Sequence, residues 1–326
     1  MSSSFDRRSL LAVGAMGLAT SVVQTSAKAE AEMTKSESAF SFCLNTSTIR
    51  KFDGKGGTPR PILEQVKIAA QAGYSALEPW IPDVRAYQES GGSLRDLRKL
   101  IEDSGLSVES SIGFAPWIVD DEARRAEGIE TAKRDMELIK AIGGKRIAAP
   151  PVGATEQSDL NLFAAAERYR KLLEAGEGIG VVPQLELWGF SKSLSRLGEL
   201  MFVAVESSHP AACVLPDIYH IYKGGSAFDG LALIDGKAIH CFHFNDYPAE
   251  PPRAKIDDAD RVYPGVGVAP IAAVVRTLIA NGCRCVLSLE LFNREYWKQD
   301  PLEVAKTGLN KMQALVEAVH PLSEGR

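Results

Sequence analysis

Short apolar runs alternate with helix-length amphipathic segments along almost the whole chain, from residue 40 to residue 319 of 326. The apolar runs lack a helical period and are rich in branched side chains, as expected for strands buried on both faces. Helices of ordinary length between consecutive strands require parallel pairing and right-handed crossovers. We predict eight strands, at or within residues 40–44, 74–77, 106–112, 146–149, 181–185, 211–216, 241–242 and 285–289.

Eight strand–helix units close a (β/α)₈ TIM barrel, and a barrel of roughly 250 residues is one domain. A doubly wound open sheet is the alternative, but that fold would place a GxGxxG turn after the first strand, and the sequence has none there. The sequence therefore predicts a single α/β barrel domain over residues 40–320.

The first thirty residues have the features of an export signal. Arg7 and Arg8 precede an apolar stretch over residues 10–23, and Ala27-Lys28-Ala29 has the small-x-small form of a cleavage site. These features predict a twin-arginine-like signal peptide over residues 1–29, followed by a disordered linker over 30–39. The apolar stretch is short for a bilayer span. We expect an exported, periplasmic protein without a membrane anchor after cleavage; an ordinary secretion signal is the alternative.

Composition narrows the class of partner. The formal net charge is −5, whereas a nucleic-acid-binding surface normally shows a basic stripe. The five cysteines form no CxxC pair, and four of them lie in strand-like runs, so we expect buried small hydrophobic residues and not a disulfide framework. A small neutral or anionic molecule is the expected partner, and homo-oligomerisation stays open.

Four of the predicted strands lead directly into a side chain that can bind a metal ion: Glu186, Asp217, His243 and Glu290. One such residue alone would usually be a solvated group at the end of a strand. Four of them, however, follow four consecutive strands, whose carboxyl ends meet at one mouth of a barrel. This set suits one divalent cation, such as Mn, Mg, Co or Zn, with coordination positions left for an oxygen-rich substrate.

Other polar residues near the strand ends are candidate substrate contacts. His220 follows Asp217 by three residues and suits a hydrogen bond to a substrate hydroxyl or a proton relay. Asp246 is interpreted as an orienting residue or substrate contact, with a turn-capping role as the alternative. Lys223 precedes two glycines and could reach an oxyanion, or simply be a solvated loop lysine. Glu78 ends the second strand and is also assigned to substrate binding.

Aromatic residues follow several strand ends. Trp117, Trp188 and Phe292 could form a wall against the apolar face of a sugar, or pack in the core or a lid. His240 faces away from His243, since the two are three positions apart, an odd number, in a strand, and it is expected to be structural.

Several short runs together resemble the sugar phosphate isomerase/epimerase family, which belongs to the xylose isomerase-like barrel superfamily. The resemblance spans Phe40 to Val319. It rests on the runs 73–78, 185–186, 217–220, 240–246, 264–267 and 287–292. It implies a divalent metal held by Glu186, Asp217, His243 and Glu290, with Glu186 and Glu290 as an acid–base pair facing each other across the substrate. In ketose 3-epimerases of this family the residue that matches His220 contacts the substrate.

This resemblance implies a metal-dependent isomerase or epimerase that works through an enediolate of a keto-sugar. A metal on the carbonyl oxygen stabilises the enediolate, and a carboxylate takes the proton. Loss of a β-substituent from the same enediolate would instead make the protein a keto-sugar or 3-keto-glycoside lyase or dehydratase. Export favours an unphosphorylated substrate, because phosphorylated sugars are mainly cytoplasmic.

Two further interpretations have less support. A nuclease of the endonuclease IV type shares the barrel, but it needs a trinuclear zinc site rich in histidine, and this chain has five histidines, of which His209 and His320 lie away from the predicted mouth. A non-catalytic periplasmic sugar-binding barrel is the other interpretation. Two carboxylates around one metal argue against it.

Overall fold

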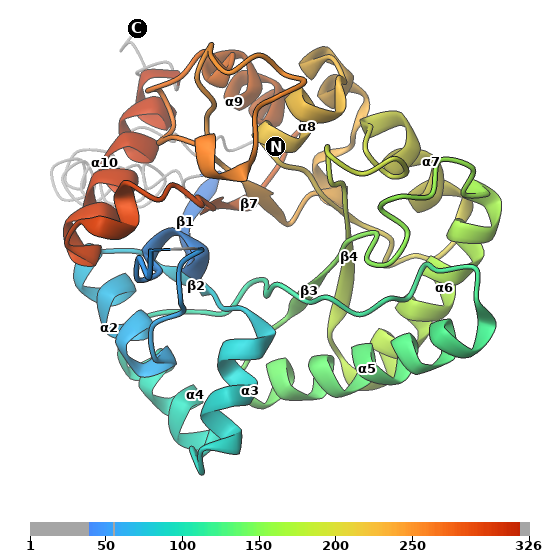
Figure 1. Cartoon of the computed structure of the whole chain (residues 1–326), viewed down its shortest axis with the longest axis horizontal. Coiled ribbons are helices and arrows are strands. Elements are labelled where there is room, and N and C mark those ends of the chain that lie inside the picture. Colours follow the sequence, from blue (N-terminus) through green and yellow to red (C-terminus); the bar gives the residue numbers. More distant parts are fainter. Residues whose placement is uncertain (1–38, 55, 320–326) are drawn as a thin grey trace, which may run out of the picture. The chain divides into compact units, whose positions relative to one another are not determined.

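The computed structural model describes residues 39–54 and 56–319, which form a parallel-stranded barrel enclosed by helices (Figure 1). The predicted leader and all but the last residue of the predicted linker lie outside the described residues. The regular strands are β1 (Phe40–Asn45), β2 (Ala76–Glu78), β3 (Arg146–Ala149), β4 (Val182–Glu186), β5 (Val214–Leu215), β6 (Cys241–His243) and β7 (Cys285–Leu289).

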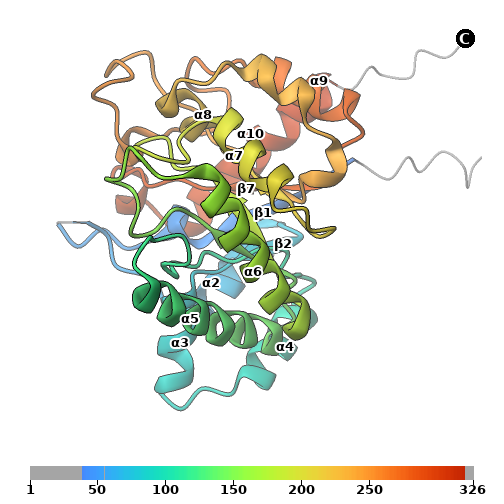
Figure 2. The same ribbon diagram turned by 90° about the vertical axis from the view of Figure 1, so that its right-hand side faces the viewer.

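Helices follow the strands along the chain and surround them. They are α2 (Ile62–Ala72), α3 (Ile81–Glu89), α4 (Leu94–Asp103), α5 (Glu122–Ala141), α6 (Leu162–Ile179), α7 (Leu197–Glu206), α8 (Ile218–Gly224), α9 (Ile271–Ala280) and α10 (Pro301–Val319). Short 3₁₀ helices lie at Thr46–Ile49, Phe228–Leu233, Gly236–Ala238, Asp258–Asp260 and Tyr296–Lys298. Figure 2 shows α5, α6 and α7 covering one side of the barrel.

The strands pair in parallel in two groups, with the orders β2-β1-β7-β6 and β3-β4-β5. Isolated bridges join the groups into a ring. Val214 pairs with Ile239, which connects β5 to the strand that carries His243. On the other side, residues 107–112 lie between β2 and β3. The predicted (β/α)₈ barrel is therefore confirmed, with all strands running in one direction.

The predicted third strand, residues 106–112, is the irregular member of the ring. It pairs with the β2 side only at two points, Ala76 with Ser107 and Trp80 with Ile112. Four residues separate Ser107 from Ile112, whereas three separate Ala76 from Trp80. The extra residue interrupts the ladder, as in a β-bulge. Residues 106–112 nevertheless form backbone hydrogen bonds on the β3 side. Lys145 N–H donates to Val108 O at 3.3 Å, and Ala148 N–H donates to Ser111 O at 2.8 Å.

Two helices were not predicted. Helix α3 follows β2 directly and has proline in its first turn, where a missing N–H costs nothing. Helix α8 begins after Asp217, whose side chain caps it by accepting from His220 N–H at 2.9 Å. Its seven residues give too few turns for a visible apolar period. The segment predicted as a short helix over 228–234 is a 3₁₀ helix.

Most buried side chains of the core are apolar, but several polar side chains are also buried. All five cysteines are buried and free, as predicted. Buried polar side chains near the barrel mouth include Glu78, Ser110, Gln184 and Ser288. Within the described part of the chain, no helix is long and apolar enough to cross a membrane.

Candidate active site

The four predicted metal ligands come together at the carboxyl ends of the strands. Glu186 and His243 are the last residues of β4 and β6, and Asp217 and Glu290 lie just beyond β5 and β7. All four residues are buried, with exposed fractions of at most 4%. Parallel strands place these four ends on one rim of the barrel, which is why residues so far apart in sequence meet.

His243 is at the centre of this cluster. Its Nδ1 lies 3.2 Å from Glu290 Oε2, 3.5 Å from Asp217 Oδ2 and 3.7 Å from Glu186 Oε1. Ligand atoms of Asp217, His243 and Glu290 all lie within 4.8 Å of one another. The two glutamates thus approach the same imidazole nitrogen from different strands.

The cluster fits a divalent cation. His243 Nδ1 and Glu186 Oε2 are buried and make no hydrogen bond within the protein. An unsatisfied buried polar atom costs free energy, so two of them in a group of three carboxylates and an imidazole indicate a further ligand there. Carboxylate oxygens and one imidazole nitrogen suit Mn²⁺, Co²⁺ or Zn²⁺ and, less well, Mg²⁺.

Burial and mutual repulsion govern the protonation of these groups. Burial raises the pKa of Glu186 well above its usual range, and the charge of His243 only partly opposes this shift. Burial alone would lower the pKa of His243, but Glu290 and Glu78 raise it well above its usual value. Burial alone would raise the pKa of Asp217, but the adjacent Arg261 guanidinium outweighs burial and holds this pKa below its usual range.

Arg261 is the main functional residue that the sequence did not reveal. Its guanidinium is fully buried, and Nη1 donates to Asp217 Oδ2 at 2.9 Å and to Glu290 Oε2 at 2.8 Å. Nη2 donates to Asp258 Oδ1. Arg261 therefore balances the charge of the carboxylates, and a metal cation bound there would share the same two oxygens with it. It lies in a loop without a strand-end signal, so no local pattern distinguished it.

Two asparagines orient the carboxylates. Asn45 Nδ2 donates to Glu290 Oε1 at 3.1 Å, and Asn245 Nδ2 donates to Asp217 Oδ2 at 3.1 Å. Asn45 is the last residue of β1, so the signal that identified the ligands, a polar residue at a strand end, is present there as well. A neutral amide is a weaker candidate for a metal ligand than a carboxylate or an imidazole. For this reason the sequence analysis did not identify Asn45 as a residue of the site.

A cavity of about 200 Å³ opens next to Glu186 and Glu290. Aromatic rings form much of its wall: Trp80 lies 5.1 Å from Phe114 and 5.9 Å from Phe292 between ring centroids, and Trp188 lies 5.3 Å from Phe190. The lining residues are Trp80, Ile112, Phe114, Glu186, Trp188, Phe190, His220, Asp258, Arg261, Glu290 and Phe292. Trp188 and Phe292 thus lie where the aromatic wall was predicted.

His220 also lines this cavity. Burial, followed by the charge of Arg261, lowers its pKa, so the imidazole is neutral at pH 7. Gly189 N–H points at Nδ1 at 3.2 Å, and Arg261 Nη2 lies 3.0 Å from Nε2. Both neighbours are donors, and a neutral imidazole accepts at only one nitrogen. At most one of these contacts is a hydrogen bond, and a substrate contact by His220 stays a prediction.

Two residues assigned to substrate binding lie in structural positions. Trp117 is buried in the core, where Nε1 donates to Pro150 O at 2.9 Å, and it does not line the cavity. Glu78 is fully buried and bonded to Asn45, Ser288 and His243. Neither side chain is placed to touch a substrate in the cavity.

Asp246 and Lys223 hold loops. Asp246 accepts from the N–H groups of Gly265, Gly267 and Ala269 at 2.9–3.0 Å, and so fixes the loop after β6. Lys223 Nζ donates to the carbonyl oxygens of Ile256, Arg253 and Ala254. Both side chains therefore have hydrogen-bond partners within the protein, and neither needs an oxyanion or a substrate as a partner. For Asp246 the position matches the alternative prediction, a turn-capping residue.

Comparison with known proteins agrees with this architecture. Residues 66–315 match the family described as Xylose isomerase-like TIM barrel. The chain belongs to this family. It is 30% identical to the inosose isomerase of Bacillus licheniformis over 191 residues, which cover 57% of this chain and 68% of that protein.

Two further similarities show the breadth of the family. The 3-dehydroshikimate dehydratase of Pseudomonas aeruginosa is 25% identical over 268 residues, which are 77% of this chain but only 38% of that protein. A crystal structure described as an IOLI protein with a binding zinc atom superposes with a TM-score of 0.78 at 23% identity. It covers 86% of this chain and 100% of that one. The family, its enzymatic relatives and the cluster make this chain an enzyme of the isomerase, epimerase or dehydratase kind.

Proposed function

We propose that this chain is a divalent-metal-dependent isomerase or epimerase that moves a proton beside the carbonyl group of a keto-sugar or keto-cyclitol. The observation that carries the proposal is the convergence of Glu186 and Glu290 on His243 Nδ1, beside a cavity that both glutamates line. A pair of carboxylates at one substrate can remove and return a proton.

Glu186, Asp217, His243 and Glu290 would hold the metal. When bound, it would supply Lewis-acid stabilisation of negative charge on the substrate oxygen. Burial raises the pKa of Glu186 above its usual range, so this carboxyl group holds a proton more readily than an exposed glutamate does. Glu290 is oriented by Asn45 and serves as the second acid–base group. Return of the proton to the opposite face gives an epimer, and return to the neighbouring carbon gives an isomer.

The cavity favours a single unphosphorylated ring. Its volume of about 200 Å³ and its aromatic wall suit the apolar face of one sugar or cyclitol. Among the described residues that line the cavity, Arg261 is the sole lysine or arginine. Its guanidinium already binds Asp217, Glu290 and Asp258, so it is not available to bind a phosphate group. The inosose isomerase relative supports a cyclic keto-polyol. We further propose that the leader directs export, where such substrates would be met.

Proton exchange in deuterated water tests the function. The metal-loaded protein is incubated with an inosose, ketohexoses and 3-keto-glycosides, and deuterium incorporation is followed by NMR. We expect incorporation at one carbon, abolished in Glu186→Gln and Glu290→Gln. The matched control Glu167→Gln, in an exposed pair with Lys171, should exchange at the wild-type rate. Absence of exchange on every substrate, with metal bound, would refute the proposal.

A dehydratase is the second candidate, favoured by the similarity to 3-dehydroshikimate dehydratase over 77% of this chain. The same proton removal would then be followed by loss of a β-hydroxyl group. Including 3-dehydroshikimate in the panel separates the two, because elimination produces a conjugated product with a new ultraviolet absorbance, whereas epimerisation leaves the spectrum unchanged.

A further inference from the structure

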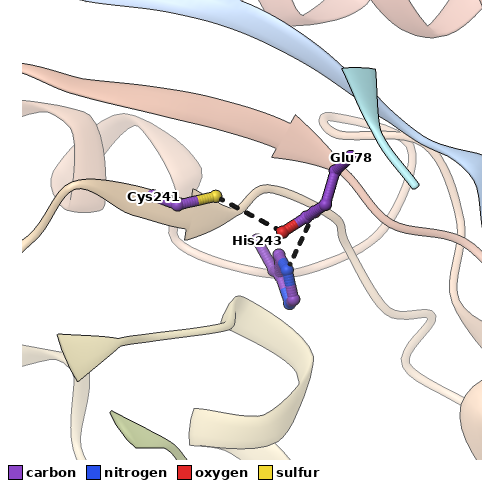
Figure 3. Close-up of side chains that lie close together, drawn as sticks. All are labelled: Glu78, Cys241 and His243. Atoms are coloured by element: carbon purple, nitrogen blue, oxygen red, sulfur yellow. Dashed lines mark hydrogen bonds and ion pairs between the residues drawn. The ribbon is translucent and has the colours of Figure 1, made fainter. Parts of the chain in front are cut away.

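Glu78 contacts the nitrogen of His243 that faces away from the candidate metal site, and one of its carboxylate oxygens has three polar neighbours. Oε2 accepts from Ser288 Oγ at 2.6 Å and from Asn45 Nδ2 at 2.9 Å, and lies 3.1 Å from His243 Nε2. Figure 3 shows the carboxylate of Glu78 next to the imidazole of His243 and the thiol of Cys241. The side chains of Glu78 and His243 have no exposed surface.

The two nitrogens of His243 therefore face different surroundings. Nε2 faces Glu78, and Nδ1 faces Glu186, Asp217 and Glu290. A carboxylate only accepts hydrogen bonds, and Nε2 lies 3.1 Å from Glu78 Oε2, whereas Nδ1 makes no hydrogen bond within the protein. Nε2 is therefore the nitrogen that donates. A metal ion at the cluster would take the place of a proton on Nδ1, so that the imidazole keeps its proton on Nε2 and directs the Nδ1 lone pair into the cluster.

We propose that Glu78 is a positioning residue that accepts a hydrogen bond from His243 Nε2–H and thereby aims the Nδ1 lone pair at the metal. The inference rests on the proposed function, because it needs a metal at Glu186, Asp217, His243 and Glu290. A carboxylate behind a metal-binding histidine fixes its tautomer and ring orientation, and its loss typically weakens metal binding by about 10- to 100-fold.

The same residues could instead form a second metal site, since ligand atoms of Glu78, Cys241 and His243 lie within 4.8 Å of one another. The bonds at Glu78 argue against this. Asn45 and Ser288 already donate to Oε2, and Cys241 Sγ lies 3.8 Å from Oε1, as a weak donor does. A cation there would displace both donors and require the imidazole to bridge two ions. One metal per chain is therefore expected.

The test combines zinc affinity with direct observation of the tautomer. Zinc dissociation constants are measured by competition with a chromophoric chelator for the wild type, Glu78→Gln and Ser288→Ala. The amide in Glu78→Gln keeps the size of the side chain but directs an NH₂ group at neighbours that donate. We expect zinc affinity to fall about 10- to 100-fold in Glu78→Gln. Ser288→Ala, which removes another bond to the same oxygen, should stay within about threefold, since His243 keeps its partner.

Long-range ¹H–¹⁵N NMR of the zinc-loaded wild type supplies the second measurement. We expect His243 to show a protonated Nε2 and a zinc-bound Nδ1, which a role in packing alone would not require. This spectrum decides the matter even if Glu78→Gln fails to fold. Unchanged zinc affinity in Glu78→Gln, zinc on Nε2, or two zinc ions per chain with one lost in Cys241→Ala would overturn the inference while leaving the proposed function intact. A wild type that binds no zinc, manganese or cobalt would overturn both.

Discussion

Individual side chains at the barrel mouth carry charges that the protein interior would not tolerate alone. Arg261 is the clearest case, because its guanidinium is fully buried between Asp217 and Glu290. Coulomb attraction to these carboxylates and to Asp258 raises its pKa despite the burial. Removing one partner of a buried ion pair typically costs about 3–5 kcal/mol, since the other charges stay buried without compensation.

We therefore expect Arg261→Met to lower the free energy of unfolding of the metal-free protein by about 3 kcal/mol. A saturating divalent metal should restore part of this loss, because a cation at the cluster again compensates Asp217 and Glu290. Urea denaturation with and without manganese measures both values. As a control, Arg98→Met, which breaks an exposed pair with Glu102, should cost less than about 1 kcal/mol. Equal losses with and without metal would contradict the expectation.

His240, which was predicted to be structural, gives a pH dependence of stability. Burial, followed by the charge of Arg146, lowers its pKa from 6.5 to about 4. As the pH falls from 6.5 to about 4, the unfolded chain binds a proton that the folded protein does not, so the folded state loses stability.

Replacing His240 by glutamine should reduce this loss by on the order of 1 kcal/mol, a value discounted because the ring is only half buried. Denaturation midpoints of the wild type and His240→Gln at pH 7 and pH 4.5 measure the difference. Parallel pH profiles for the two proteins would show that the protonation of His240 is not coupled to folding.

At the scale of elements, close packing of helices against loops decides details that periodicity does not show. In α5, Gly128 lies against the backbone of the loop that follows residues 107–112. A Cβ at this position would come within 2.5 Å of Pro116 O. Glycine inside a helix costs up to about 1 kcal/mol relative to alanine. At position 128, glycine permits α5 to pack closely against the loop that contains Pro116.

Gly128→Ala should therefore destabilise the protein by about 1–3 kcal/mol, although alanine is the better helix former. Gly178→Ala is the matched control, since a Cβ added to this glycine of α6 would meet no heavy atom within 4 Å. We expect it to stabilise by up to about 1 kcal/mol. Thermal unfolding of both variants provides the comparison, and a stabilising Gly128→Ala would refute the packing argument.

At the scale of the whole molecule, the cluster joins four neighbouring strands that span the junction between the two groups of the ring. Glu186 and Asp217 belong to the β3-β4-β5 side, and His243 and Glu290 to the β2-β1-β7-β6 side. A cation bound to all four would link the two groups of strands, which are otherwise joined by isolated bridges.

Metal should consequently stabilise the entire barrel. A ligand that binds only the folded state, at 100 times its Kd, adds about 2.7 kcal/mol. For a folded domain of about 280 residues this corresponds to a rise in Tm of about 4–5 °C. Differential scanning calorimetry with manganese, and with a chelator, measures the shift. Asp217→Asn should largely lose it, whereas Glu167→Gln should keep it. A Tm independent of metal in the wild type would exclude metal-linked stability.

The alternation of apolar runs and helical segments was sufficient to predict the barrel, because parallel strands separated by helices have few ways to close. It was also sufficient to predict that Glu186, Asp217, His243 and Glu290 converge, because every parallel strand presents its carboxyl end at the same rim. Both conclusions follow from local periodicity and strand direction.

Tertiary structure alone decided the rest. Glu78 and His243 are 165 residues apart, and no local pattern states which ring nitrogen faces Glu78. Arg261 lies in an irregular loop, and only its contacts with two strand ends reveal its role. The extra residue between Ser107 and Ile112 appears only when its partners on β2 are known. These features depend on distances between distant segments, which side-chain periodicity along the chain does not encode.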